Sequence, residues 1–327
     1  MERNTLETRG LHSQSLVKRA SSLHVVSRTL FESLRSGSFK SIYKGRGIEF
    51  SGVREYFLGD DVRSIDWNVT ARMGRPFVKQ FEEDRELVLF LVVDASLSMT
   101  TGGGKVARNR LQAGCEVAAL MALAASLGGG SVGGVIFDGD IRYSHKPRAG
   151  NNQALMFLNQ LDSVLKSVGE DGLVDEGADF ATTEKGSNQL SDPSLGSNLH
   201  KALRGAASLL KKRSLVLVIS DFRTAGYQKD LAVLASRHDV VAVRIADPVD
   251  GHLEGVGSLP FVDLESGYRQ ILPTSSSSFQ QGWKDADKKR VERWNAECYR
   301  RGAWPLTIST QEDVAVALQR FFSGREM

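Results

Sequence analysis

Short apolar runs alternate with longer helical patterns through most of this sequence, and this alternation limits the fold more than any other feature. The apolar runs suit strands that are buried on both faces; they lie at residues 87–93, 132–137, 215–219, 240–245 and 305–308. Helical patterns occupy residues 105–127, 151–168, 198–212, 227–237, 279–301 and 311–323. Strands and helices in this order form right-handed crossovers, so the sequence predicts an α/β fold with a doubly wound, mainly parallel sheet.

Two segments interrupt the alternation. Residues 168–193 are rich in Gly, Ser, Asp and Glu and contain few apolar side chains, so we expect a long mobile loop there. Residues 259–272, with Gly267 near the centre, have the pattern of a hairpin added to the sheet. The predicted main domain is therefore residues 87–327, with one insertion and one additional hairpin.

The first 86 residues have a different character. Apolar residues recur at helical spacing between Leu16 and Leu34, which predicts an amphipathic helix. We favour packing of this helix on the main domain, but the basic residues around it keep a peripheral membrane or acidic-partner contact open. Residues 48–86 alternate apolar and charged positions between Gly and Asp, which predicts a small β-rich segment of short strands and turns.

The composition is that of an ordinary globular protein and excludes several functional classes. The net charge of +3 over 327 residues gives no general electrostatic reason to expect nucleic acid as a partner. Cys115 and Cys298 form no CxxC motif, which argues against a disulfide scaffold or a zinc site. The longest apolar stretch, Val117–Leu127, is shorter than the roughly 20 residues that cross a bilayer. We expect a soluble, cytoplasmic protein without a transmembrane segment.

Oxygen-bearing side chains follow two of the predicted strands and precede one of the predicted helices. Asp94, Ser96 and Ser98 follow the first strand, Asp221 follows the strand at 215–219, and Ser197 precedes the helix at 198–212. Ligands of open parallel sheets bind at the carboxyl ends of the strands, where such residues meet. Two carboxylates and three hydroxyls, without imidazole or thiolate, suit a hard cation, so we expect Mg²⁺ with Mn²⁺ as the next candidate.

This set of five residues resembles the metal-ion-dependent adhesion site (MIDAS) of von Willebrand factor type A (vWA) domains, in the order Asp94-x-Ser96-x-Ser98, then Ser197, then Asp221. Ser197 stands where that family usually has Thr. The resemblance implies a vWA fold of Rossmann-like type. It also implies that the hydroxyls and aspartates hold a metal with one position left for a carboxylate of a partner, so that the site binds protein and does not catalyse a reaction.

A second resemblance covers almost the whole chain. The motifs Arg46-Gly-Ile-Glu-Phe50, Val53-Arg-Glu-Tyr56, Gly59-Asp-Asp-Val-Arg63, Ile65-Asp-Trp67 and Ala71-Arg72 are similar to the bacterial family called domain of unknown function 58. Ser309-Thr310-Gln311 and Asp313 resemble the C-terminal end of the same family. Genes of that family commonly neighbour those of MoxR-type AAA+ ATPases. The resemblance implies an adaptor that works with such an ATPase in chaperone-like remodelling or complex assembly and presents an unknown client protein.

The charged residues of these motifs also have a purely physical interpretation. Charge-assisted hydrogen bonds among them, with two aromatic rings as anchors, would lock the segment onto the main domain. We favour this structural role over direct partner binding. The residues concerned are Arg54, Asp60, Asp61, Arg63, Asp66 and Arg72, with Tyr56 and Trp67 as the anchors.

Enzymatic interpretations are weaker but remain as alternatives. Thr101-Gly-Gly-Gly-Lys105 fails the phosphate-loop pattern at both ends, and the glycines at 128, 130 and 133 precede a predicted strand instead of following one. A metal-dependent phosphatase-like hydrolase would use Asp94 as nucleophile, but the acid expected two residues later is Ser96. The other alternative is a structural vWA module with an inactive metal site. We therefore predict that the protein is not an enzyme.

Overall fold

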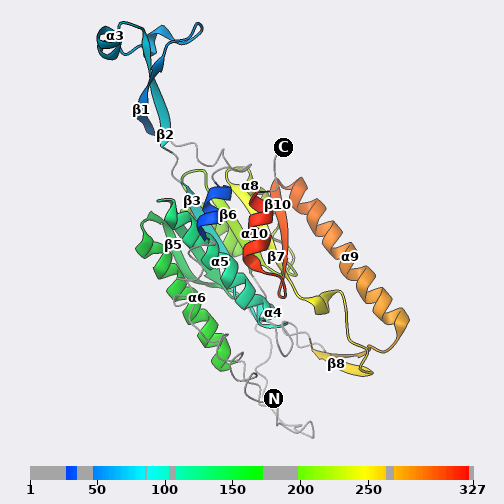
Figure 1. The fold of residues 1–327 in the computed structure, drawn as a ribbon. Coiled ribbons are helices and arrows are strands. Elements are labelled where there is room, and N and C mark those ends of the chain that lie inside the picture. The colour runs from blue at the N-terminus through cyan, green and yellow to red at the C-terminus, as the bar shows by residue number, and fades with distance from the viewer. Residues whose placement is uncertain are drawn as a thin grey trace, which may run out of the picture.

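The computed structural model describes residues 27–34, 47–84, 87–102, 108–171, 198–262 and 269–323. Its centre is a six-stranded sheet with the strand order β10-β7-β6-β3-β4-β5 (Figure 1). These strands are β3 (Val88–Asp94), β4 (Ser131–Phe137), β5 (Ile141–Ala149), β6 (Leu215–Ser220), β7 (Asp239–Ala246) and β10 (Ala303–Ser309). Every neighbouring pair is parallel except β4 and β5. The prediction of an α/β fold with a mainly parallel sheet is confirmed.

Helices cover both faces of this sheet because its central strands are apolar on both sides. Leu89, Leu91 and Val93 of β3 belong to one buried cluster, whereas Phe90 and Val92 belong to a second. This division follows from the two-residue period of a strand. The first cluster includes side chains of α5 (Arg110–Leu127), α6 (Asn151–Asp171) and α10 (Val314–Ser323). The second includes α7 (Leu199–Leu209), α8 (Gln228–Ala235) and α9 (Ser277–Arg300).

The edge strand β5 was not predicted. Its side chains alternate between exposed and half-buried, so it lacks the continuous apolar run that marks the central strands. It pairs antiparallel with β4 and contains Pro147, which is compatible with a sheet edge because the missing N–H is not needed there. An apolar-run criterion cannot find a strand of this kind.

The described part of the N-terminal helix, residues 27–34, packs on the main domain. Leu30 and Leu34 are buried in the same cluster as α5 and α10. Ser323 Oγ, at the end of α10, donates a hydrogen bond to Ser33 Oγ at 2.9 Å. This half of the predicted helix therefore has the packing role that we favoured, and the half from residue 16 to 26 lies outside the described residues.

Residues 47–84 form a separate two-stranded sheet of β1 (Gly47–Glu55) and β2 (Phe77–Asp84), which stands apart from the central sheet (Figure 1). The connection between its strands contains the 3-10 helix η2 (Val62–Ser64) and the α-helix α3 (Trp67–Met73). We expected only strands and turns here, so α3 corrects that prediction. Asp66 caps the N-terminus of α3, and Gly74 ends it in the left-handed region at φ 68°.

The network predicted within residues 54–72 is also corrected. Arg54 donates two hydrogen bonds of 2.7 Å to Asp60, but Asp61 and Asp66 cap helices instead of binding arginines. Among the described residues, each of these side-chain bonds has its partner inside residues 47–84. Trp67 is 67% exposed, so it is not the buried anchor that we predicted. The segment is therefore not locked onto the central sheet by these side chains.

The hairpin predicted at 259–272 consists of β8 (Ser258–Val262) and β9 (Arg269–Pro273). It forms its own two-stranded sheet and is not an extension of the central one. The helix α6 continues to Asp171 and so takes in the first four residues of the predicted mobile loop, and residues 172–193 of that loop lie outside the described part of the chain.

One helix of the described chain, α5, is long and apolar enough by length and composition to cross a membrane. In this structure 72% of it is buried. Its apolar residues pack against β3, β4, α6 and α10, so the core accounts for its composition. The short connecting helices α4 (Leu97–Thr100) and η3 (Pro248–Asp250) complete the carboxyl end of the sheet.

A buried histidine beside this sheet predicts a loss of stability in mild acid. Burial lowers the pKa of His238 below its ordinary value of 6.5, and His238 Nδ1 has no hydrogen-bond partner in the described chain. As the pH falls through 6.5, the unfolded chain takes up this proton before the folded chain does, so the free energy of unfolding decreases, by at most about 1.4 kcal/mol per pH unit. Urea unfolding at pH 7 and 5.5 measures this slope.

The variant His238→Gln should show a shallower slope than the wild type over this range. The exposed His252 offers a matched control, since His252→Gln should leave the slope unchanged. Equal slopes in all three proteins would contradict the assignment to His238.

Candidate metal centre

The carboxyl ends of β3 and β6 lie side by side because these strands are parallel neighbours in the sheet. Asp94 is the last residue of β3, and Asp221 directly follows β6. Ser96 is the N-cap of α4, and Ser98 lies in its first turn, with the two hydroxyl oxygens 3.2 Å apart. The structure thus places four of the five predicted residues at one end of the sheet, while Ser197 lies outside the described residues.

Asp94 is completely buried, and each of its carboxyl oxygens accepts a hydrogen bond. Oδ1 accepts from the backbone N–H of Ser96 at 3.0 Å, and Oδ2 accepts from Ser220 Oγ at 2.7 Å. Burial raises the pKa of Asp94; the hydrogen bonds from Ser96 and Ser220 oppose this rise, and the nearby Asp221 adds to it. A cation beside these two carboxylates would favour their charged forms.

Ser220 is a site residue that the sequence reasoning missed. Its hydroxyl donates to Asp94 and accepts from the backbone N–H of Phe222 at 3.1 Å, so it connects the two strand ends. The signal was a polar residue at the last position of an otherwise apolar strand. Ser220 therefore holds the Asp94 carboxylate in a fixed orientation.

The backbone of the turn after β6 is constrained at Phe222, the residue that follows Asp221. Phe222 has φ 53°, and among the described non-glycine residues it alone has a positive φ. Such strained positions concentrate at functional sites. Asp221 Oδ1 accepts from the Arg223 N–H at 3.1 Å, but the buried Oδ2 has no hydrogen-bond partner in the described chain, and the Arg223 Nε lies 3.8 Å from it. This oxygen is available to a further ligand.

These residues fit a hard cation. Two carboxylates, one of them with a free oxygen, accompany two hydroxyls that lie 3.2 Å apart. Within the described chain, no group of three or more His, Cys, Asp or Glu residues is arranged to hold a metal, so a metal here would depend on hydroxyl ligands as well. Hydroxyl and carboxylate oxygens are the donors that Mg²⁺ takes.

A buried ion cluster lies next to the candidate metal centre. The Asp250 carboxylate accepts from Arg110 Nη2 at 2.5 Å and from Arg223, and its second oxygen accepts from the Asp247 N–H at 3.1 Å. Arg110 and Asp250 side chains are each 3% exposed. Because Arg223 also approaches Asp221, this cluster fixes the turn that carries one of the candidate ligands.

The fold and the site together define a class: an α/β protein whose mainly parallel sheet carries an oxygen-donor cluster at its carboxyl end. The model of the family described as "Protein of unknown function DUF58" matches residues 52–293, so the chain belongs to this family. The uncharacterized protein Rv1480 of Mycobacterium tuberculosis is 28% identical over 293 residues, which cover 88% of this chain and 83% of that protein. An uncharacterized protein of Mycobacterium bovis shows the same identity and coverage.

Two solved structures show a weaker similarity. The conserved hypothetical protein BatB from Bacteroides thetaiotaomicron is 13% identical, with a TM-score of 0.38 over 73% of this chain and 98% of that one. An aerotolerance-related membrane protein from Bacteroides fragilis is 16% identical, with a TM-score of 0.41 over 73% of this chain and 97% of that one.

Metal binding should be visible as a thermal shift. We expect Mg²⁺ to raise the thermal midpoint, because a ligand that binds only the folded state stabilises it by about 2.7 kcal/mol at one hundred times its Kd. Ser96→Ala and Asp221→Ala should abolish the shift, whereas the exposed Ser278→Ala should retain it. If millimolar Mg²⁺ or Mn²⁺ does not raise the thermal midpoint of the EDTA-treated wild type, the result would argue against the site.

Proposed function

We propose that this protein is a non-catalytic, metal-dependent adaptor that binds a partner protein through Asp94, Ser96, Ser98 and Asp221, completed by Ser197. The observation that carries the proposal is that a buried oxygen of Asp221 without a hydrogen-bond partner in the described chain and a pair of hydroxyls both lie at the carboxyl end of the sheet. Two carboxylates balance the charge of Mg²⁺ but, with the hydroxyls, do not complete its octahedral shell, so a coordination position is left for an Asp or Glu of a partner.

We further propose that the domain is of the vWA type and that the site is a MIDAS. A mainly parallel sheet, covered by helices on both faces and closed by one antiparallel edge strand, supports this assignment. The location of the donors at the ends of β3 and β6 supports it as well. In this proposal Mg²⁺, or Mn²⁺ in its place, supplies the contact with the partner carboxylate.

The far end of the β1-β2 hairpin supports a second contact with a protein partner. Five large apolar side chains there are each more than half exposed: Phe57, Leu58, Val62, Trp67 and Met73. Such a concentration of exposed apolar side chains marks an interaction surface. The acids around them are engaged as helix caps or ion pairs, whereas Arg63 and Arg72 have no ion-pair partner in the described chain. These two free cations suit a partner with acidic groups around an apolar surface.

The partner that we propose is a MoxR-type AAA+ ATPase, met in the cytoplasm, with an unidentified client protein presented for remodelling. Reversible, metal-dependent binding would let the ATPase engage and release the adaptor during its cycle. This step follows from the family resemblance and from the chemistry of the site.

The test mixes the purified protein with the MoxR-type ATPase that a neighbouring gene encodes. Sedimentation velocity measures their association. The wild-type protein should bind the ATPase in the presence of Mg²⁺. Its affinity should fall at least tenfold in EDTA, and the Ser98→Ala variant should show a similar loss in Mg²⁺. A Leu58→Ser/Trp67→Ser variant should bind more weakly with an unchanged response to EDTA, because the hairpin lies apart from the metal. The exposed Ser278→Ala serves as the control. Equal binding by all variants and in EDTA would contradict the metal bridge, and absence of binding throughout would remove the proposed partner.

The structure offers less support to a phosphatase that uses Asp94. That carboxylate is fully buried, and both of its oxygens are already hydrogen-bonded. A nucleophile must reach its substrate. Hydrolysis of p-nitrophenyl phosphate that disappears in Asp94→Asn would restore the enzymatic alternative, and a lack of any response to metal would favour a structural module with an inactive site.

A further inference from the structure

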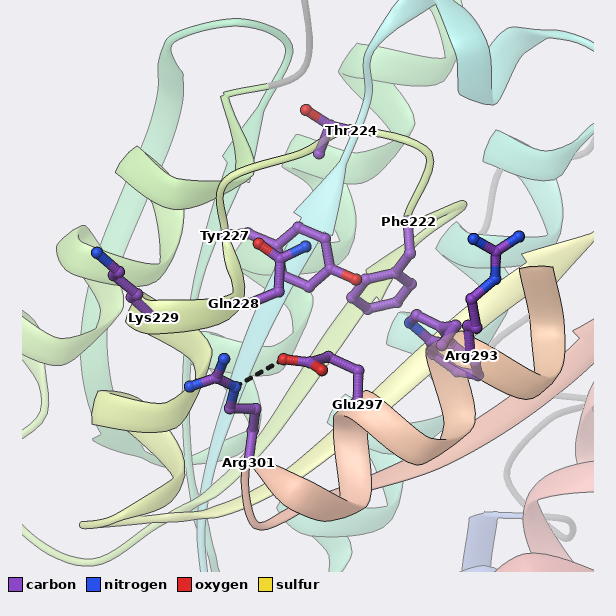
Figure 2. Close-up of a pocket in the computed structure, with 9 residues that line it drawn as sticks. Phe222, Thr224, Tyr227, Gln228, Lys229, Arg293, Glu297 and Arg301 are labelled. Carbon is purple, nitrogen blue, oxygen red and sulfur yellow. Dashed lines mark hydrogen bonds and ion pairs between the residues drawn. The ribbon is translucent and has the colours of Figure 1, made fainter. Parts of the chain in front are cut away.

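A pocket of about 480 Å³ lies between the loop after β6 and the C-terminal half of α9 (Figure 2). Three buried aromatic residues form its walls: Phe222, Tyr227 and Trp294. The Phe222 ring centroid lies 5.5 Å from that of Tyr227 and 5.2 Å from that of Trp294. The pocket begins one residue after Asp221, but none of the four described candidate metal ligands lines it. Its walls suit an apolar or aromatic group.

The rim of this pocket is basic. Lys229, Arg293 and Arg301 line it, against a single acid, Glu297. Glu297 is already engaged, since it accepts a hydrogen bond from Arg301 Nε at 2.7 Å (Figure 2). It also pairs with Arg300. Within the described chain, Lys229 and Arg293 have no carboxylate partner, although Arg293 donates to the Lys289 carbonyl at 3.2 Å. The rim therefore carries two uncompensated cations.

The α8 N-terminus adds uncapped backbone donors to the same pocket. Its N-cap residue, Tyr227, provides no side-chain cap, and Gln228 and Lys229, the first two residues of the helix, line the pocket. Asp230, the acid in the first turn, is held by Arg204 at 2.8 Å. The free N–H groups and the helix dipole favour an anion at such a terminus.

Trp294 provides an independent observation. Its side chain is 7% exposed, and its Nε1 is buried without a hydrogen bond of normal geometry. The Tyr227 hydroxyl approaches the Trp294 side chain: burial raises the pKa of Tyr227, and the contact with Trp294 opposes that rise. A buried N–H donor without a full hydrogen bond is costly, so an acceptor from a ligand would stabilise this arrangement.

From these features we propose that the pocket binds a carboxylate attached to an apolar or aromatic group, as found at the C-terminus of a peptide. The apolar group would pack on Phe222, Tyr227 and Trp294, and the carboxylate would lie among Lys229, Arg293 and the α8 N-terminus. Inorganic phosphate satisfies the cations but leaves the aromatic walls uncovered. Binding to this pocket does not require the metal, so its test is independent of the test of the metal-dependent adaptor function.

The first test titrates N-acetylphenylalanine into the ¹⁵N-labelled full-length protein in EDTA and follows the tryptophan indole N–H signals by NMR. Trp294→Phe assigns the Trp294 signal. We expect a saturable shift of that signal with a Kd in the millimolar range, of the order of a weak single-site contact. N-acetylphenylalaninamide, which lacks the charge, and inorganic phosphate, which lacks the ring, should each bind at least tenfold more weakly. Equal shifts with either compound, or no shift at about 20 mM of the acid, would overturn the proposal.

The second test removes the rim cations. Lys229→Gln/Arg293→Gln should weaken binding of N-acetylphenylalanine by at least tenfold, because charge-assisted contacts are lost. Both residues are exposed, so the variant should fold, and an unchanged thermal midpoint verifies this. Lys288→Gln removes a charge from α9, the helix of Arg293, at a position outside the pocket. This variant should bind N-acetylphenylalanine like the wild type. Identical affinities for the double variant and this control would overturn the assignment of the ligand to the pocket.

Discussion

Replacing Asp250 with alanine is expected to lower the free energy of unfolding by about 3–5 kcal/mol, because it leaves a buried charge without its partner. The Asp250 carboxylate binds Arg110, whose side chain is 3% exposed, and also binds Arg223. It further accepts the backbone N–H of Asp247. Without it, the Arg110 guanidinium would stay inside the protein with only Thr101 as a described side-chain partner.

Urea unfolding of the variant measures this loss. Asp285→Ala provides the control, since Asp285 is an exposed acid on α9 and its removal should cost less than about 0.5 kcal/mol. The double variant Arg110→Met/Asp250→Ala should recover part of the loss, because it removes both charges together. A loss below about 1 kcal/mol for the single variant would show that Arg110 finds another partner or reaches solvent.

The ion cluster around Asp250 could not be predicted from the sequence, unlike the pair Asp94 and Asp221. Asp94 and Asp221 were predicted to lie together because the ends of parallel strands meet at one edge, a rule that needs only the strand assignment. No comparable rule brings Arg110 to Asp250, which is 140 residues away. Such contacts depend on how α5 and the loop after β7 pack, and packing is not encoded in a periodic pattern.

Helix α3 was missed for a different reason. None of its described residues is buried, so it has no apolar stripe that periodicity would reveal. Its signals were local: Asp66 at the N-cap, and Gly74, which ends it at φ 68°. Capping residues alone would have located this helix, although they would not have shown that Trp67 is exposed.

Gly128 and Gly130 lie between α5 and β4, and Gly133 lies in β4; the structure shows what requires a glycine at each position. A Cβ on Gly128 would meet the Phe31 ring of the N-terminal helix at 2.0 Å, and one on Gly130 would meet the Leu87 carbonyl oxygen at 2.6 Å. On Gly133 it would meet the backbone of Pro147 in β5 at 2.5 Å. These positions require glycine because neighbouring elements approach closely. The spacing of the glycines therefore carries no information about a phosphate.

The same close approach predicts a large effect for Gly134→Ala. Gly134 lies in β4 opposite Leu91 of β3, and an added Cβ would be 2.6 Å from the Leu91 carbonyl oxygen and 2.6 Å from the Phe157 ring. Neither the backbone of a central strand nor a buried ring can move away freely in a close-packed interior. We expect the free energy of unfolding to fall by about 3 kcal/mol, at the upper end of overpacking effects.

Gly282→Ala in α9 is the matched control, because nothing lies within 4 Å of its added Cβ. That change should stabilise the protein by about 0.5–1 kcal/mol, since alanine restricts the unfolded chain and favours the helix. Urea unfolding of both variants measures effects of opposite sign from the same chemical change. A Gly134→Ala protein as stable as the wild type would mean that β3 and β4 can separate locally at this point, and the orientation of Asp94 at the end of β3 would then be less firmly fixed than its two hydrogen bonds indicate.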